Sequence, residues 1–414
     1  MENKKEKKRK RKMENSSSET LHVEDLQTEI MSWLPLKSLL RFVIVSKKWA
    51  SIIRGEQFKA LYLRRSMTRP RLMFMVRRIA TLPPEPEMVW FQSFCKEERC
   101  IPGQLEVEFL FHSVYQEKIP YFSSGQQQLR VPPNTNYTSV SQPIGGLICL
   151  QSETKFALCN PGTKKSRALP DIQAHEKAFI TSFLGYDEAT NVFKVLCLTM
   201  VWAHEPSKRV YEYQVLTVES GVESCSWRGI TCKEKDHTPE TQGLCKGGVL
   251  YYGARSTSDH RPLVMSFNVR SQEFTAIELP DQLHISYFWN FVIYNGDIAL
   301  VNESDFDPRV VNEPNGNKVF HIWVRDATAQ EWQRTRIEIP RWEQNVGHVD
   351  YVFRGTTGTK ELVFAQDSRH CEDDFFVLYY DTFTKDLRRF QIGVTGPKIS
   401  VRTCLDHVDS LWLM

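Results

Sequence analysis

The stretch VMSFNVRSQEFTAIELP, residues 264–280, contains the pattern that decides the fold. An apolar strand runs to Phe267, a turn opens at Asn268, and a second strand ends in aliphatic residues before Pro280. Short apolar segments separated by turn residues are typical of β-hairpins. The same unit occurs as FALCNPGTKKSRALP (156–170), FHIWVRDATAQEWQRTRIEIP (320–340) and FVLYYDTFTKDLRRFQI (376–392), with a weaker copy, YEYQVLTVESGVESCSWRGI, at 211–230.

The spacing of these hairpins indicates how they are arranged. The turn positions Asn160, Thr217, Asn268, Asp326 and Asp381 are 57, 51, 58 and 55 residues apart. Another apolar pair precedes each hairpin, which makes roughly four strands per unit and a period close to the ~50 residues of kelch repeats. Such a unit cannot cover both of its faces alone, so we predict a β-propeller. A β-sandwich is the alternative, and the regular period disfavours it.

The two ends of the β region are expected to meet. Residues 399–414 read as the beginning of another blade, and strands at 71–76 and 104–112 would complete it and close the ring.

The segment EIMSWLPLKSLLRFVIVSKKWASII, residues 29–53, has a helical pattern instead. Leu26, Ile30 and Leu34 follow helical spacing, and the apolar stripes after Pro35 predict a second and a third helix. A module of this size buries only about 60% of its unfolded surface, and each large apolar side chain left in water costs about 1.5–3 kcal/mol. We therefore expect a partner protein, or the propeller, to cover this surface. An ordinary helical cap on the β domain is the alternative.

Charge and cysteine content exclude several classes of protein. Residues 1–12, MENKKEKKRKRK, carry a net +6, so the other 402 residues of the 414-residue chain sum to −3, which does not support a nucleic-acid-coating body. The basic tail is either a nuclear localisation signal or a solubilising arm. No apolar run follows it, so neither a secretory signal nor a membrane partner is expected. The ten cysteines form no CxxC pair, and reduced thiols in the nucleus and/or cytoplasm are expected.

Chemical motifs are absent from the sequence. There is no HExxH, no glycine-rich phosphate loop and no Cys/His nucleophile signature. HCEDD at 370–374 could suggest a metal or an acid–base pair, but metal sites need ligands from several elements and no second cluster is evident. We interpret it as a solvated loop and expect no catalytic residue, no metal and no cofactor.

Residues 25–53, DLQTEIMSWLPLKSLLRFVIVSKKWASII, closely resemble the F-box. Two positions depart from its usual pattern: Val23 replaces a proline, and Val43 stands where a basic residue is common. In that family the three-helix module docks on the Skp-type linker protein of cullin–RING ubiquitin ligases. The resemblance implies that the docking surface is formed or supported by Leu26, Ile30, Leu34, Pro35, Leu39, Phe42, Val45 and Trp49.

A second resemblance spans about residues 142–392. The following blocks look like successive parts of the plant F-box-associated domain, type 3: GLICL, LCNPGTKKSRALP, SFLGYDEATNVFKVLCL, SWRGITC, GGVLYYGARSTSDHRPLVMSFNVRSQEFTAIELP, IWVRDATAQEWQR and FVLYYDTFTKDLRRF. That domain is regarded as kelch-like and serves in substrate recognition. Since binding usually resides in the loops at one end of a propeller, the longest predicted loop, 302–318, supplies the candidate target-contacting residues Asp305, Asp307, Arg309 and Asn312.

Together these observations predict an α+β chain. Its expected parts are a disordered basic tail (1–20), a three-helix F-box (21–66), a linker with a possible strand (67–103) and an all-β, kelch-like propeller (104–414). The expected function is that of a non-catalytic substrate adaptor of a Skp–cullin–F-box ubiquitin ligase, with the Skp-type linker and an unidentified target protein as partners. A non-degradative scaffold, a propeller-fold hydrolase and nucleic-acid binding through the tail are the alternatives.

Overall fold

The computed structural model describes residues 25–79, 107–115, 126–129, 139–175, 178–202, 209–222, 224–234, 236–280, 283, 289–302, 316–326, 328–347, 349–358, 360–366, 375–392 and 400–413. Residues 25–32 are helical, and α2 (Leu36–Val45), α3 (Lys47–Arg54) and α4 (Glu56–Met67) follow. The three expected helices are therefore present, and α4 is an additional one. None of the helices among these residues is long and apolar enough to cross a bilayer.

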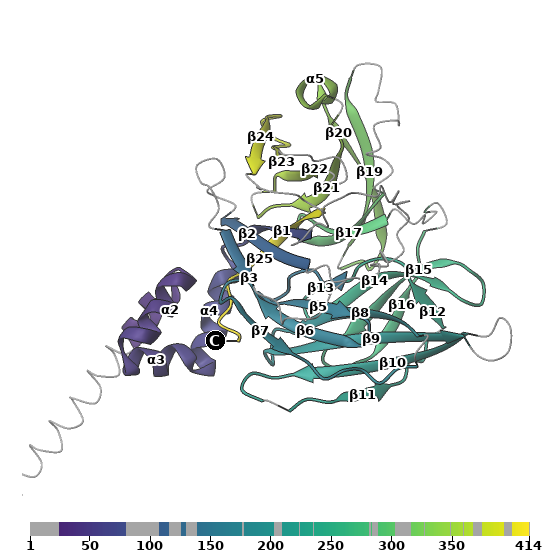
Figure 1. Ribbon diagram of the computed structural model, residues 1–414. Helices are drawn as coiled ribbons and strands as arrows, with labels where there is room; N and C mark the ends of the chain where they lie inside the picture. The colour runs from purple at the N-terminus through teal and green to yellow at the C-terminus, as the bar shows by residue number, and fades with distance from the viewer. Residues whose placement is uncertain are drawn as a thin grey trace, which may run out of the picture.

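The remaining described residues form six antiparallel sheets, which are the blades of a propeller (Figure 1). We number the blades along the chain from the one that contains β1. In the second to sixth blades the strands follow one another outward in chain order. The second blade holds β4 (Ser139–Val140), β5 (Ile148–Ser152), β6 (Lys155–Asn160) and β7 (Lys165–Ala168), and the third holds β8 (Phe179–Asp187), β9 (Val192–Trp202), β10 (Arg209–Val218) and β11 (Trp227–Ile230).

The next three blades repeat this plan. In the fourth, both β12 (His237–Pro239) and β13 (Leu244–Lys246) pair with β14 (Val249–Ser256), and β15 (Pro262–Asn268) and β16 (Phe274–Ile277) follow. The fifth comprises β17 (Trp289–Tyr294), β18 (Asp297–Asn302), β19 (Lys318–Arg325) and β20 (Trp332–Ile339), with α5 (Trp342–Val346) after it. The sixth comprises β21 (Tyr351–Thr356), β22 (Leu362–Gln366), β23 (Phe375–Tyr380) and β24 (Leu387–Ile392).

The first blade joins both ends of the β region. Its order is β25 (Ser400–His407), β1 (Arg71–Ile79), β2 (Val107–Tyr115) and β3 (Gln126–Leu129), with Val76 opposite Val401 and Met75 opposite Phe111. The predicted closure of the ring is therefore confirmed. The expected boundary at residue 104 is too late, because β1 is a propeller strand and not part of a linker.

The hairpins that revealed the repeat share one turn. Asn160, Asn268, Asp326 and Asp381 each lie between the third and fourth strands of a blade, and each side-chain Oδ1 accepts hydrogen bonds from the backbone N–H groups two and three residues ahead. Four residues after each, the backbone is left-handed, at Lys164 (φ 59°), Gln272 (62°), Gln330 (60°) and Lys385 (62°). Thr217 lies inside β10, so the third blade keeps the spacing without this turn.

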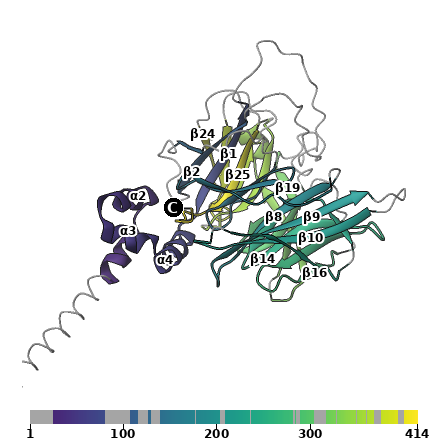
Figure 2. The ribbon, with the colours of Figure 1, turned by 60° about the horizontal axis from the view of Figure 1, so that its bottom comes forward.

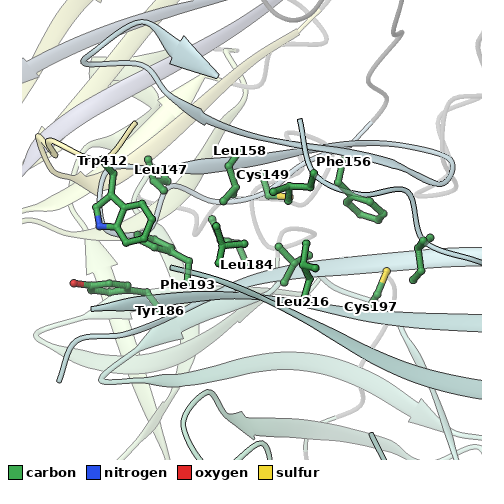
Figure 3. Packing of buried hydrophobic residues seen from close by; sticks show 14 of the residues in the cluster. Leu147, Cys149, Phe156, Leu158, Leu184, Tyr186, Phe193, Cys197, Leu216 and Trp412 are labelled. Atoms are coloured by element: carbon green, nitrogen blue, oxygen red, sulfur yellow. The ribbon is translucent and has the colours of Figure 1, made fainter. Parts of the chain in front are cut away.

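Apolar side chains fill the spaces between blades. One cluster joins the second and third blades through residues such as Leu158, Leu184 and Phe193, with Trp412 from the chain end packed among them (Figure 3). Cys149 and Cys197 belong to the same cluster as free thiols, and burial raises the pKa of Cys149 to about 12. They act as small apolar side chains, as their sequence context predicts.

Candidate protein-docking surface

The helical module, residues 25–67, has a small core of its own. Pro35 precedes α2, and Ser46 caps α3 by accepting a hydrogen bond from the backbone N–H of Trp49 (3.4 Å). The buried members of the core are Met31, Leu36, Leu39, Ile53, Phe58 and Tyr62, together with Leu411 from the chain end. The core of the module is therefore built around Leu36 and Leu39 of α2, and α4 contributes its buried aromatic side chains.

Large apolar side chains remain outside this core. Leu26 is 60% exposed, Ile30 55%, Ile44 86% and Val45 74%. In both ribbon views α4 lies between α2–α3 and the sheets, so the propeller does not extend over the outer side of the module (Figure 2). A helical segment that exposes this much aliphatic surface is characteristic of a protein-interaction site.

The predicted docking residues occupy three environments. Leu26, Ile30, Pro35 and Val45 are exposed, whereas Leu39 is completely buried. Half-buried are Leu34, Phe42 and Trp49, and the rings of the last two are 4.7 Å apart. The four exposed residues can therefore contact a partner directly, while the buried Leu39 supports the surface from beneath.

Two exposed residues of the module were missed by the sequence reasoning. Ile44 lies one position beyond the α2 stripe of Leu36, Leu39, Leu40 and Val43, and that offset is the signal that would have placed it outward. Trp33 is 46% exposed and lies beneath the guanidinium groups of Arg65 (4.2 Å) and Arg69 (5.0 Å). Arg65 lies in the last turn of α4 and Arg69 lies two residues beyond that helix, so no local pattern around Trp33 predicts this stacking.

The rim of the surface is basic around α2 and α3. From Leu36 to Arg54 the chain contains no acidic residue, and its five cationic side chains are all exposed: Lys37, Arg41, Lys47, Lys48 and Arg54. An apolar face with a cationic rim best fits a partner whose own apolar patch is bordered by carboxylates.

The module rests on one particular end of the propeller. A Cβ added to Gly162, in the β6–β7 turn, would lie 2.5 Å from Leu36 Cδ2. In the β10–β11 connection, the Ser220 hydroxyl donates to Glu56 (2.8 Å) and accepts from Lys59 (3.2 Å). Burial raises the pKa of the Glu56 carboxyl, but hydrogen bonds from Lys59 and Ser220 more than offset this, and the pKa lies below its ordinary value.

Both contacts are made by turns that join the third strand of a blade to the fourth. Because neighbouring strands are antiparallel, these turns and those between the first and second strands lie at the same end, which we call the helix-bearing face. The connections between second and third strands lie at the opposite end, the far face. Asn302 and Lys318, which flank the β18–β19 connection, are at the far face.

Asp305, Asp307, Arg309, Asn312 and the HCEDD segment all lie outside the described residues. Within the part of the chain that the structure describes, no group of three or more His, Cys, Asp or Glu residues could hold a metal ion.

Comparison with known proteins agrees with this geometry. Residues 23–61 match the family described as F-box domain, and residues 93–410 match the family described as F-box associated beta propeller domain. Two Arabidopsis thaliana proteins named as F-box proteins are 46% and 45% identical to this chain, covering 97% of it and 100% of themselves. The F-box/kelch-repeat protein At3g04660 of the same plant is 32% identical, over 93% of this chain and 91% of that protein.

Among solved structures, the β-propeller domain of the Trilobed protease from Pyrococcus furiosus aligns with a TM-score of 0.35 at 8% identity, over 70% of this chain and 74% of that one. The two family matches and the full-length relatives carry the assignment. The chain belongs to the F-box proteins that carry an F-box-associated β-propeller domain.

Proposed function

We propose that this protein is the substrate-recognition adaptor of a Skp–cullin–F-box ubiquitin ligase. The observation that carries the proposal is the aliphatic surface of the F-box, where Leu26, Ile30, Ile44 and Val45 stay exposed although the propeller is packed against the same module. Burying each of these side chains against a partner would contribute about 1.5–3 kcal/mol. The partner is a Skp-type linker protein, and its contacting face is apolar with an acidic border.

The chain itself performs no bond chemistry in this proposal. It holds a target protein near the ligase's other subunits, so that ubiquitin transfer becomes effectively intramolecular. The nucleus and/or cytoplasm is the proposed site of action.

The target is proposed to bind at the far face of the propeller. The F-box occupies the helix-bearing face, through Gly162 and Ser220, so a target at the far face would not compete with the ligase core for space. Asp305, Asp307, Arg309 and Asn312 are proposed to contribute to this binding on the strength of their sequence and of the far-face position of Asn302 and Lys318.

The first experiment measures binding of the full chain to a purified Skp-type linker by calorimetry. Leu26→Asp combined with Ile30→Asp places two charges on exposed positions, so the fold is retained while binding falls at least about a hundredfold. Val210→Asp is the matched control, because Val210 is 43% exposed near the start of β10, at the opposite end of that strand from the contact between Ser220 and the F-box. A folded wild-type chain that fails to bind the linker would rule out the ligase assignment.

The second experiment separates an adaptor from a scaffold. Proteins that co-purify with the chain are followed after protein synthesis is stopped, in cells with and without it. Longer half-lives for a subset in its absence support delivery for degradation, whereas unchanged half-lives for all of them favour the scaffold.

A further inference from the structure

We infer that residues 408–413, which follow the last propeller strand, form a strap that locks the F-box onto the propeller, and that Asn160 is the residue that holds the strap. This goes beyond the proposed function, because it concerns how the two modules are joined and not what either one binds. Both family matches leave out the last part of the strap, since they end at residues 61 and 410.

The strap inserts side chains into two different cores. Val408 and Trp412, 6% and 3% exposed, pack between the second and third blades, where Trp412 meets the ring of Phe193 edge-on with centroids 4.8 Å apart (Figure 3). Leu411 lies between them in sequence but points into the F-box core, where it is 1% exposed. This short segment therefore supplies buried side chains both to the propeller and to the helices.

Helix α4 is divided between the same two cores. Its Phe58 and Tyr62 belong to the F-box cluster with Leu411, whereas Leu63 packs in the blade cluster with Val408 and Trp412. The helix and the strap are also joined directly, because the backbone N–H of Asp409 donates to the Ser66 hydroxyl (2.7 Å). The two segments therefore form one paired element that bridges the modules.

Asn160 secures the polar side of the strap. Its Nδ2 donates to the backbone carbonyls of Ser410 (2.9 Å) and Trp412 (2.8 Å), on either side of Leu411. Its Oδ1 meanwhile accepts from Gly162 and Thr163 and forms the β6–β7 turn. One buried side chain thus ties the strap to the turn on which the F-box rests.

Other contacts fix the strap along its length. The Arg71 guanidinium forms an ion pair with Asp409 (3.1 Å), and the Trp412 indole N–H donates to Asn191 Oδ1 (3.3 Å). Gly146, with φ at 80°, leaves the room the strap needs, because a Cβ there would lie 2.4 Å from the Ser410 Cβ. Gly146, Asn160 and Asn191 lie in or next to turns of the helix-bearing face, which join β4 to β5, β6 to β7 and β8 to β9.

The test uses hydrogen–deuterium exchange on the full chain. Asn160→Asp keeps the Oδ1 that the turn requires but removes both donors to the strap, and it places a carboxylate near the buried Asp409. Asn268→Asp is the matched control, because Asn268 makes the same turn bonds in the fourth blade and is exposed. We expect exchange in α4 and the strap to rise at least about tenfold in Asn160→Asp, with β14 and β15 unchanged, and to stay at wild-type rates in Asn268→Asp.

Leu411→Ala provides a second measurement that does not disturb the turn. The hydrogen bonds from Asn160 go to backbone carbonyls and remain possible in this variant. The propeller should therefore keep its protection from exchange, while the F-box core loses the buried Leu411 side chain. Faster exchange in α4 and in residues 25–32, with unchanged exchange in the blades, supports the strap. Wild-type exchange in α4 in both Asn160→Asp and Leu411→Ala would overturn it, as would equal loosening in Asn160→Asp and Asn268→Asp.

Discussion

Replacing Ile44 and Leu39 by alanine, one at a time, separates the docking surface from the core beneath it. Each substitution removes three side-chain carbons from α2, but Ile44 is 86% exposed and Leu39 is fully buried. If the linker protein covers Ile44, Ile44→Ala should lose about 0.8 kcal/mol of binding free energy per carbon removed. Scaling by the exposed fraction gives about 2 kcal/mol, which raises Kd roughly thirtyfold. The unfolding free energy of Ile44→Ala should stay within about 0.5 kcal/mol of wild type.

Leu39→Ala should behave in the opposite way. The side chain lies in the cluster with Met31, Ile53 and Tyr62, so its truncation leaves a cavity and should lower the stability of the F-box by about 2–5 kcal/mol. Any effect on linker binding should be small where the module is still folded, because Leu39 presents no surface of its own.

The assay combines calorimetric titration with a Skp-type linker and urea denaturation of each variant. Phe383→Ala serves as the control for nonspecific effects, because Phe383 is 93% exposed on the turn after β23 and should change neither quantity. Unchanged affinity in Ile44→Ala, with wild type binding tightly, would show that the end of α2 is not covered and would refute the reasoning from exposure.

Three further predictions concern stability. Gly162→Val places side-chain atoms against Leu36 and should weaken the packing of the F-box on the propeller by about 1–3 kcal/mol. Limited proteolysis should then cleave α4 earlier than the blades. Burial, together with nearby Arg71, lowers the pKa of His407 to about 3, so on acidification the unfolded chain takes up this proton before the folded chain does. The neutral His407 therefore makes its full contribution to the unfolding free energy above pH 6.5, and that contribution is lost as the pH falls toward 3. Between pH 7.5 and 5.5, urea denaturation should therefore show His407→Gln losing about 1.4 kcal/mol less stability than wild type. Asp381→Ala removes two hydrogen bonds from the β23–β24 turn and should lower the unfolding free energy by about 1–2 kcal/mol, which thermal denaturation would detect.

The propeller was predictable because its signal is local and repeated. A carboxylate or carboxamide at Asn160, Asn268, Asp326 and Asp381 closes the same turn in four blades, so the period can be read without knowledge of the fold. The pairing of β1 with β25 followed from counting strands, although the sequence around Arg71 did not distinguish a linker strand from a blade strand.

The docking surface was predictable only in part. Helical spacing identifies which residues of α2 are apolar, but the depth of burial depends on α3, α4 and the strap, which is why Leu39 is covered and Ile44 is not. The strap itself has no local signal: Leu411 and Trp412 are adjacent apolar residues at the end of a strand region, and they enter different cores because two modules meet there.

This junction bears on how an adaptor could work. A flexible tether would let the F-box and the target-binding surface move independently, and the effective concentration of a bound target near the ligase would then depend on tether length. Here α4 and the strap are buried against both modules, and Arg71 begins the propeller only four residues after α4 ends at Met67. The distance between the F-box surface and the far face is therefore set by the packed propeller between them, and a target at the far face would be presented at one orientation. Variants that loosen the strap should accordingly slow target ubiquitination more than they weaken linker binding. Leu26, Ile30, Ile44 and Val45 are exposed on the F-box, whereas the strap is held by Asn160 of the propeller.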